Sequence, residues 1–156
     1  MSSIFTGLTT EQVADLSTAQ IASLTTEDIS GIATEQLVAL TAIQVPALST
    51  LIVAALATEQ VAALATEQVV ALTTRQVQAL ETADISVLGT AQVRALEASD
   101  VAVLKTEQVV ALTTAQMSAL TTAQIVALTT AQVKAIETAD LAALSTAQIV
   151  AVQTAD

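Results

Sequence analysis

The sequence contains no cysteine and no histidine. Without cysteine the chain forms neither a disulfide nor a thiolate metal site, and without histidine it lacks the most common acid–base and metal-binding side chain. Phe5 is the one aromatic residue, so the hydrophobic residues, 53% of the chain, are mainly Ala, Val, Leu and Ile. We therefore predict a protein without a cofactor, whose core is made of aliphatic side chains.

Basic residues are also scarce, four against 15 acidic ones, which gives a net charge of −11. A nucleic-acid partner requires basic side chains that displace counterions from phosphates, and an anionic membrane surface repels an acidic chain. Two uncharged stretches, 36–58 and 108–133, are long enough to cross a bilayer, but both carry Thr and Gln throughout and the first contains Pro46. We predict neither a nucleic-acid partner nor a membrane span.

Groups that could perform catalysis are missing. With only three glycines the chain has no glycine-rich phosphate loop, and its Ser and Thr residues follow a repeat instead of lying beside a base. The acidic residues fall at positions that we expect to face water, where no desolvated pair of carboxylates can form. We predict that the protein is not an enzyme.

A repeat of eight residues runs along the chain without an insertion. An aliphatic residue opens each octad, beginning at Leu8, and a second one follows five residues later, beginning at Val13. The consensus is L-T-T-[E/A]-[Q/D]-V-x-A. Residues 8–151 hold eighteen full octads, residues 1–7 are predicted to form an N-terminal cap with Ile4 and Phe5 as its lid, and residues 152–156 are a partial repeat.

The repeat length argues against a continuous helix and against a strand. Eight residues advance an α-helix by about 800°, so an aliphatic stripe would drift by about 80° per octad. In a strand, residues five apart point to opposite faces. A β-solenoid stays as the alternative, although its corners favour Gly, Asn and Asp.

A helix that is interrupted once per octad fits the repeat better than a continuous helix or a strand does. Thr occupies the third position of nearly every octad, as in Thr10 and Thr18, where its hydroxyl can N-cap a helix. Acidic residues then fall in the first turn, at positions four and five, where the helix dipole favours them. Positions six and one, three residues apart, form one aliphatic face.

Such short helices cannot be stable alone, since isolated helices need about 12–15 residues. Each octad must therefore bury its aliphatic face, and the small residue at position eight, against its neighbours. We predict an all-α solenoid of very short helices, one per octad, extending over residues 8–151 as one solenoid. In solution it should be longer than a globule of the same mass.

The fifth and sixth octads depart from the consensus. Ile43, Leu51 and Ile52 are branched aliphatic residues at positions where other octads carry Glu, Ala or Gln, and Pro46 removes a backbone donor within the helical segment. One interpretation is a structural kink, and the other is an apolar contact with a protein partner made by Ile43, Leu51 and Ile52.

Two further alternatives concern polar side chains. Three octads pair Glu at position two with Asp at position five: Glu81/Asp84, Glu97/Asp100 and Glu137/Asp140. Such pairs can bind Ca²⁺ weakly, although caps that favour the helix dipole explain them as well. The regular threonines allow an ice-binding surface, but the varied residues at position two argue against a flat one.

The segments ALTTAQM (111–117), ALTTAQV (127–133) and LTTEQVA (8–14) resemble the Thr/Gln-rich octapeptide arrays of large repetitive bacterial proteins, which are adhesin-like or uncharacterised. The resemblance implies a structural or surface spacer, at the bacterial cell surface or outside the cell, and transfers no site residues. Together the patterns predict a non-catalytic scaffold, spacer or self-assembling filament, whose copies associate head to tail or bind a protein partner. The alternatives are the binding module and the weak Ca²⁺ or ice binder described above.

Overall fold

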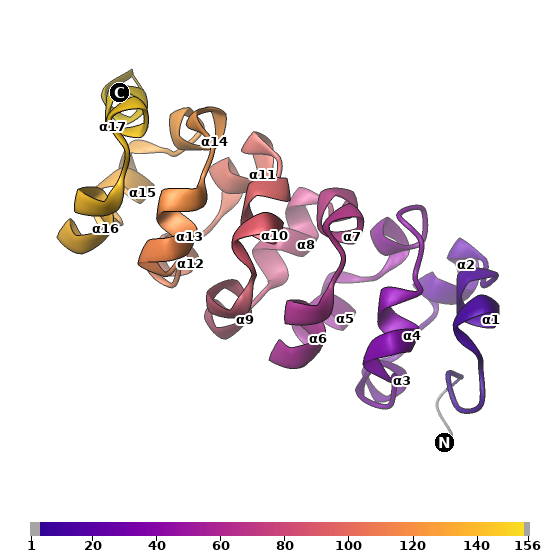
Figure 1. Cartoon of the computed structure of the whole chain (residues 1–156). Coiled ribbons are helices and arrows are strands. Elements are labelled where there is room, and N and C mark those ends of the chain that lie inside the picture. Colours follow the sequence, from indigo (N-terminus) through magenta and orange to yellow (C-terminus); the bar gives the residue numbers. More distant parts are fainter. Residues whose placement is uncertain (1–3, 155–156) are drawn as a thin grey trace. The chain divides into compact units, whose positions relative to one another are not determined.

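The computed structural model describes residues 4–154 of the chain (Figure 1). The chain divides into two compact units, Met1–Leu80 and Glu81–Asp156, and each is described by itself. All regular elements within residues 4–154 are helices and none is a strand, which excludes the β-solenoid alternative for that part of the chain. The predicted all-α fold is confirmed.

Helices follow one another at the spacing of the octads. In the first unit they are α1 (Thr10–Ala14), α2 (Thr18–Ala22), α3 (Thr26–Ser30), α4 (Thr34–Val38), η1 (Val45–Ala47), α5 (Thr50–Ala54), α6 (Thr58–Ala63), α7 (Thr66–Ala71) and α8 (Thr74–Ala79). In the second unit they are α9 (Thr82–Val87), α10 (Thr90–Ala95), α11 (Ala98–Val103), α12 (Thr106–Val110), α13 (Thr114–Ala119), α14 (Thr122–Val126), α15 (Thr130–Ala135), α16 (Thr138–Ala143) and α17 (Thr146–Thr154).

Two extended residues, at positions one and two of the octad, lie between many of the successive α-helices. Between α13 and α14, for example, Leu120 has φ −56° and ψ 140°, and Thr121 has φ −73° and ψ 159°. The chain therefore leaves the helix at the aliphatic residue of position one, one residue earlier than the predicted break at the threonine pair.

Each helix packs against the helix of the third octad along the chain. In the first unit α1 contacts α4, α2 contacts η1, α3 contacts α5, α4 contacts α6, η1 contacts α7, and α5 contacts α8. In the second unit α9, α10 and α11 contact α12, α13 and α14, which in turn contact α15, α16 and α17. Each unit is thus a solenoid in which short helices stack in columns (Figure 1).

The core of each unit consists of three positions of the octad. Position six is most deeply buried, as shown by Val61 and Val93, which are 0% exposed, and position one is nearly as deep. Position five, which carries Gln or Asp, is buried as well through most of both units. Position eight was expected in the core, but its alanines are mostly half-buried or exposed. The polar side chain of position five therefore belongs to the core, where we expected the small residue of position eight.

Pro46 changes the fifth octad locally. A 3-10 helix, η1, replaces the α-helix there, because proline at position seven cannot donate the backbone hydrogen bond of an α-turn. Gln44 nevertheless keeps the hydrogen bonds that its position makes in other octads, including one of 2.7 Å from the Thr41 N–H. The octad therefore stays in register with its neighbours.

The segment before the first octad follows the same register. Phe5 lies eight residues before Val13, and it is 1% exposed, whereas Ile4 is 43% exposed. The next turn contains Gly7 at φ 81°, a left-handed conformation that favours glycine. Residues 1–3 of the predicted cap lie outside the described residues.

Candidate functional site

The N-cap of each α-helix from α1 to α16 lies at position two. Thr113 has an extended backbone, and its hydroxyl accepts a hydrogen bond from the Gln116 N–H at 3.3 Å. Thr9, Ser17, Thr25, Thr73, Thr121 and Thr129 make the same bond in their octads. The prediction that the third-position threonine is the N-cap is wrong by one residue. The reason is that the chain is still extended at position two and is already helical at position three.

The side chain at position five completes the N-cap from the other direction. In α14 the Gln124 Oε1 accepts the backbone N–H of Thr121 at 2.8 Å, and in α7 the Gln68 Oε1 accepts the N–H of Ala65 at 2.9 Å. This bond forms whether position two is Thr, Ala, Gly or Lys, because it uses the backbone of that residue. It therefore explains why position two can vary.

The amide NH₂ of the same glutamine reaches the preceding turn of the solenoid. Gln124 Nε2 donates to the carbonyls of Val93 at 2.8 Å and Leu96 at 2.7 Å, 31 and 28 residues earlier. We call this arrangement the glutamine bridge. It is made in the first unit by Gln36, Gln44, Gln60, Gln68 and Gln76, and in the second unit by Gln116, Gln124, Gln132 and, with a 30-residue instead of a 31-residue span, Gln148.

The glutamine bridge joins the two kinds of helix end that lack intrahelical partners. Its oxygen accepts an N–H at the start of one helix, and its nitrogen donates to carbonyls at the end of another. Since the donor bonds span 28 and 31 residues and an octad has eight, one turn of each solenoid takes between three and four octads. The bridge is buried, as Gln76 is 1% exposed and Gln116 is 2% exposed.

Four octads carry Asp at position five, and they fall into two environments. Asp28 accepts hydrogen bonds from the Thr25 hydroxyl at 2.6 Å, the Thr25 N–H at 3.0 Å and the Ile4 N–H at 3.0 Å. These bonds, the Thr25 hydroxyl first, lower the pKa of Asp28 below its ordinary 3.8. Asp84 and Asp100 are 2% exposed, and burial raises the pKa of each above 3.8.

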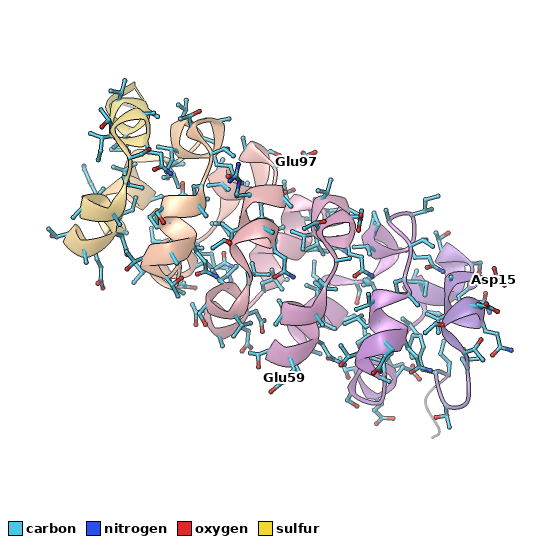
Figure 2. The ribbon with its side chains drawn as sticks, viewed as in Figure 1. Asp15, Glu59 and Glu97 are labelled. Atoms are coloured by element: carbon cyan, nitrogen blue, oxygen red, sulfur yellow. The ribbon has the colours of Figure 1, made fainter. Side chains whose placement is uncertain are left out.

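In each Glu/Asp pair the aspartate is buried and the glutamate is exposed, and weak Ca²⁺ binding by these pairs stays a prediction. Asp84 Oδ2 accepts the backbone N–H of Glu81 at 2.9 Å inside the second unit, whereas the Glu81 side chain is exposed. Figure 2 shows other exposed carboxylates, Asp15, Glu59 and Glu97, extending outward from the ribbon. Within residues 4–152 no group of three or more acidic side chains is placed to share a metal.

The predicted partner-contact residues are split between surface and core. Ile43 is 79% exposed and Leu51 is 74% exposed, more than any other large hydrophobic residue of the described chain. Ile52 occupies position five and is 2% exposed, so it takes the place of a bridge glutamine inside the first unit. A contact with a partner at these residues stays a prediction.

The glutamine bridge is the feature that the sequence analysis missed. Position five was counted among the solvated first-turn positions because it carries Gln and Asp. Its near-constancy was the available signal: position four varies among Glu, Ala, Ser, Arg, Ile and Leu, whereas position five is Gln or Asp in every octad except the one with Ile52. A position that only met water would not be restricted in this way.

The stacked short helices and their periodic bridges define the class of protein: an all-α repeat protein of the solenoid type. Residues 44–74, 53–81, 77–114, 109–135 and 133–156 match the ALTTAQ repeat, and together these matches cover residues 44–156. The chain belongs to the ALTTAQ repeat family. No curated protein and no solved structure shows a significant match to the chain.

The family match confirms the octapeptide resemblance over most of the chain. The bacterial and adhesin-like setting that the resemblance implied stays a prediction. No helix within the described residues has both the length and the hydrophobicity needed to cross a bilayer.

Proposed function

We propose that the chain is a non-catalytic structural repeat protein that acts as a scaffold, a spacer or a self-assembling filament. The observation that carries the proposal is the glutamine bridge, since the same side chain makes the same three bonds from octad to octad within each unit. None of the buried side-chain N or O atoms of the described residues lacks a hydrogen-bond partner.

A spacer has a length that depends on the number of its repeats. Chains lengthened by four and by eight consensus octads should keep folding, because each added octad supplies its own bridge. Small-angle X-ray scattering should give a maximum dimension that grows in proportion to the number of octads. A particle whose dimension grows only with the cube root of its mass would contradict the proposal.

Head-to-tail association of copies belongs to the same proposal, since stacked repeats offer the same donors and acceptors to a neighbouring molecule. Sizing with multi-angle light scattering over a wide concentration range separates a spacer from a filament. A spacer should give one mass at all concentrations, whereas a filament should give a mass that rises with concentration.

A second candidate is a protein-binding module, favoured by the exposure of Ile43 and Leu51. The triple variant Ile43→Glu, Leu51→Glu and Ile52→Gln should lose partner binding or self-association and keep the far-UV circular dichroism spectrum of the wild type. The matched control is Ala123→Glu with Ala131→Glu, which adds the same charges at position four of other octads. If both variants behave alike in sedimentation, the apolar pair has no special role in association.

A further inference from the structure

The Asp residues at position five of the second unit stand where other octads have a bridge glutamine. Asp84 and Asp100 are 2% exposed, like the bridge glutamines Gln116 and Gln124. Asp84 accepts the Glu81 N–H at 2.9 Å, which reproduces the acceptor half of the bridge. Asp100 does the same with the Glu97 N–H at 3.1 Å.

The N–H donors of the bridge glutamine are missing at these two sites, because the residue is aspartate. A glutamine side chain has two N–H donors, whereas an ionised carboxylate has none and a protonated carboxyl group has one. Burying an ionised carboxylate with a single hydrogen bond is unfavourable, because it loses most of its hydration. Protonation by solvent removes the charge and with it the cost of burying an ionised group.

The charged groups around the two sites also favour protonation. Glu81 and Glu97, in the same octads, place a second negative charge near Asp84 and Asp100. Within the second unit α9, which carries Asp84, packs against α12, which carries Glu107 and follows Lys105. Helix α11, which carries Asp100, packs against α14, which has no charged residue. The charge that acts on Asp84 is that of Glu81, and the charge that acts on Asp100 is that of Glu97.

Asp28 shows the opposite arrangement at the same position of the octad. It accepts N–H groups from Thr25 and Ile4 and the hydroxyl of Thr25, so its ionised form is well hydrogen-bonded. The chain therefore supplies its own control: one repeat position, one residue type and two environments.

We propose that Asp84 and Asp100 are acid-responsive sites, which take up protons as the pH falls and thereby stabilise the second unit. This inference is independent of whether the chain acts as a spacer or a binding module.

The direction in which pH changes the stability follows from the environment of each carboxyl group in the folded chain. Burial raises the pKa of Asp84 and Asp100 above 3.8, so their contribution is fully present below 3.8. It is lost as the pH rises through the raised folded-state pKa. Asp28, whose pKa is lowered below 3.8, contributes stability above 3.8 and loses it as the pH falls through the lowered value.

The direct test is a carboxyl-carbon NMR titration of the full wild-type chain. Asp84 and Asp100 should titrate above 3.8, and Asp28 should titrate below 3.8. Asp84 and Asp100 titrating at or below 3.8 would overturn the proposal. This measurement needs no variant, so it decides the question even if a substitution prevents folding.

The second test compares stabilities by denaturant unfolding between pH 3.5 and pH 7.5. In the variant Asp84→Asn with Asp100→Asn the side chains stay the same size but carry no charge at any pH. The variant should be more stable than wild type at pH 7.5, and the difference should vanish near pH 3.5. Each pH unit by which one carboxyl pKa is raised corresponds to a tenfold change in the ratio of folded to unfolded chain.

The control variant Asp28→Asn should change in the opposite sense, with lower stability than wild type at pH 7.5 and a difference that begins to shrink only as the pH falls below 3.8. A difference between wild type and the double variant that stays constant with pH would show that the two aspartates act only through packing, and the proposal would fail.

Discussion

At the scale of the residue, glutamine suits position five because it combines an acceptor and two donors on one amide. Asparagine is one methylene shorter, and glutamate has no donor when ionised. In the octads that make the glutamine bridge the oxygen is used within the octad and the nitrogen in the preceding turn, as in Gln68, whose Nε2 donates to the carbonyls of Leu37 at 2.9 Å and Leu40 at 2.8 Å. One side chain therefore couples local helix formation to stacking.

The substitution Gln124→Glu tests this coupling. The oxygen that accepts the Thr121 N–H is kept, but the donors to the carbonyls of Val93 and Leu96 are lost. The variant should lose roughly 1–3 kcal/mol of unfolding free energy at neutral pH, or more because the new group is charged. Chemical denaturation monitored by circular dichroism measures the loss.

The matched control for this variant is Gln12→Glu. Gln12 is exposed in the first octad, and its Oε1 accepts the Thr9 N–H at 2.9 Å without a donor bond to a preceding turn. Its replacement should change the unfolding free energy by less than about 0.5 kcal/mol. Equal losses in the two variants would show that the donor bonds of the bridge contribute nothing.

At the scale of the element, helices of five or six residues are far shorter than the ~12–15 residues that a helix needs on its own. Their ends make up most of their length, so capping dominates their stability. Within each unit both ends of a helix find hydrogen-bond partners. The side chain at position two and the glutamine oxygen cap the start, and the glutamine nitrogen donates to carbonyls at the end. The helices are therefore stable only as members of a stack.

The location of the N-cap is testable with two neighbouring substitutions. Thr113→Ala removes the hydroxyl that accepts the Gln116 N–H, and it should lower the unfolding free energy by about 1 kcal/mol. Thr114→Ala changes the first helical residue, which is exposed, and should be close to neutral. Thermal unfolding of both variants distinguishes the two positions. A larger loss of stability for Thr114→Ala than for Thr113→Ala would show that the N-cap lies at position three.

Much of the element scale was predictable. The eight-residue spacing of aliphatic residues predicted one short helix per octad, and the acidic residues at position four, such as Glu11 and Glu59, lie in the first turn as expected. The cap was misplaced by one residue, because Thr at both positions two and three allows either assignment from sequence. Only the backbone conformation distinguishes them.

At the scale of the whole molecule, the octad length must be kept wherever octads stack. Deleting residues 121–128 removes one full octad and leaves every later position in register with carbonyls 28 and 31 residues earlier. Deleting residues 121–127 shifts the register by one residue, so that Gln132 no longer lies 31 and 28 residues after the carbonyls of Val93 and Leu96, as it does after the first deletion. The first deletion should stay helical with a modest loss of stability, and the second should unfold much of the second unit.

Far-UV circular dichroism and amide hydrogen exchange measure the outcome of the two deletions. The eight-residue deletion is the control for the loss of contacts, because it removes more residues than the seven-residue one. If the smaller deletion were the less damaging of the two, stacking would not depend on the register of the glutamine bridge.

The sequence by itself determined the helical class, the unit of eight residues and the aliphatic positions one and six, because periodicity reports which side chains share a buried face. It also singled out Ile43, Leu51 and Ile52 as departures from the repeat, although not that the first two are exposed and the third is buried. Only the tertiary structure decided that position five is inside, that one turn takes between three and four octads, and which aspartates meet donors. The physical reason is that these features depend on hydrogen bonds between residues 28 to 31 apart, and a repeat of identical octads does not specify which of its copies will pair.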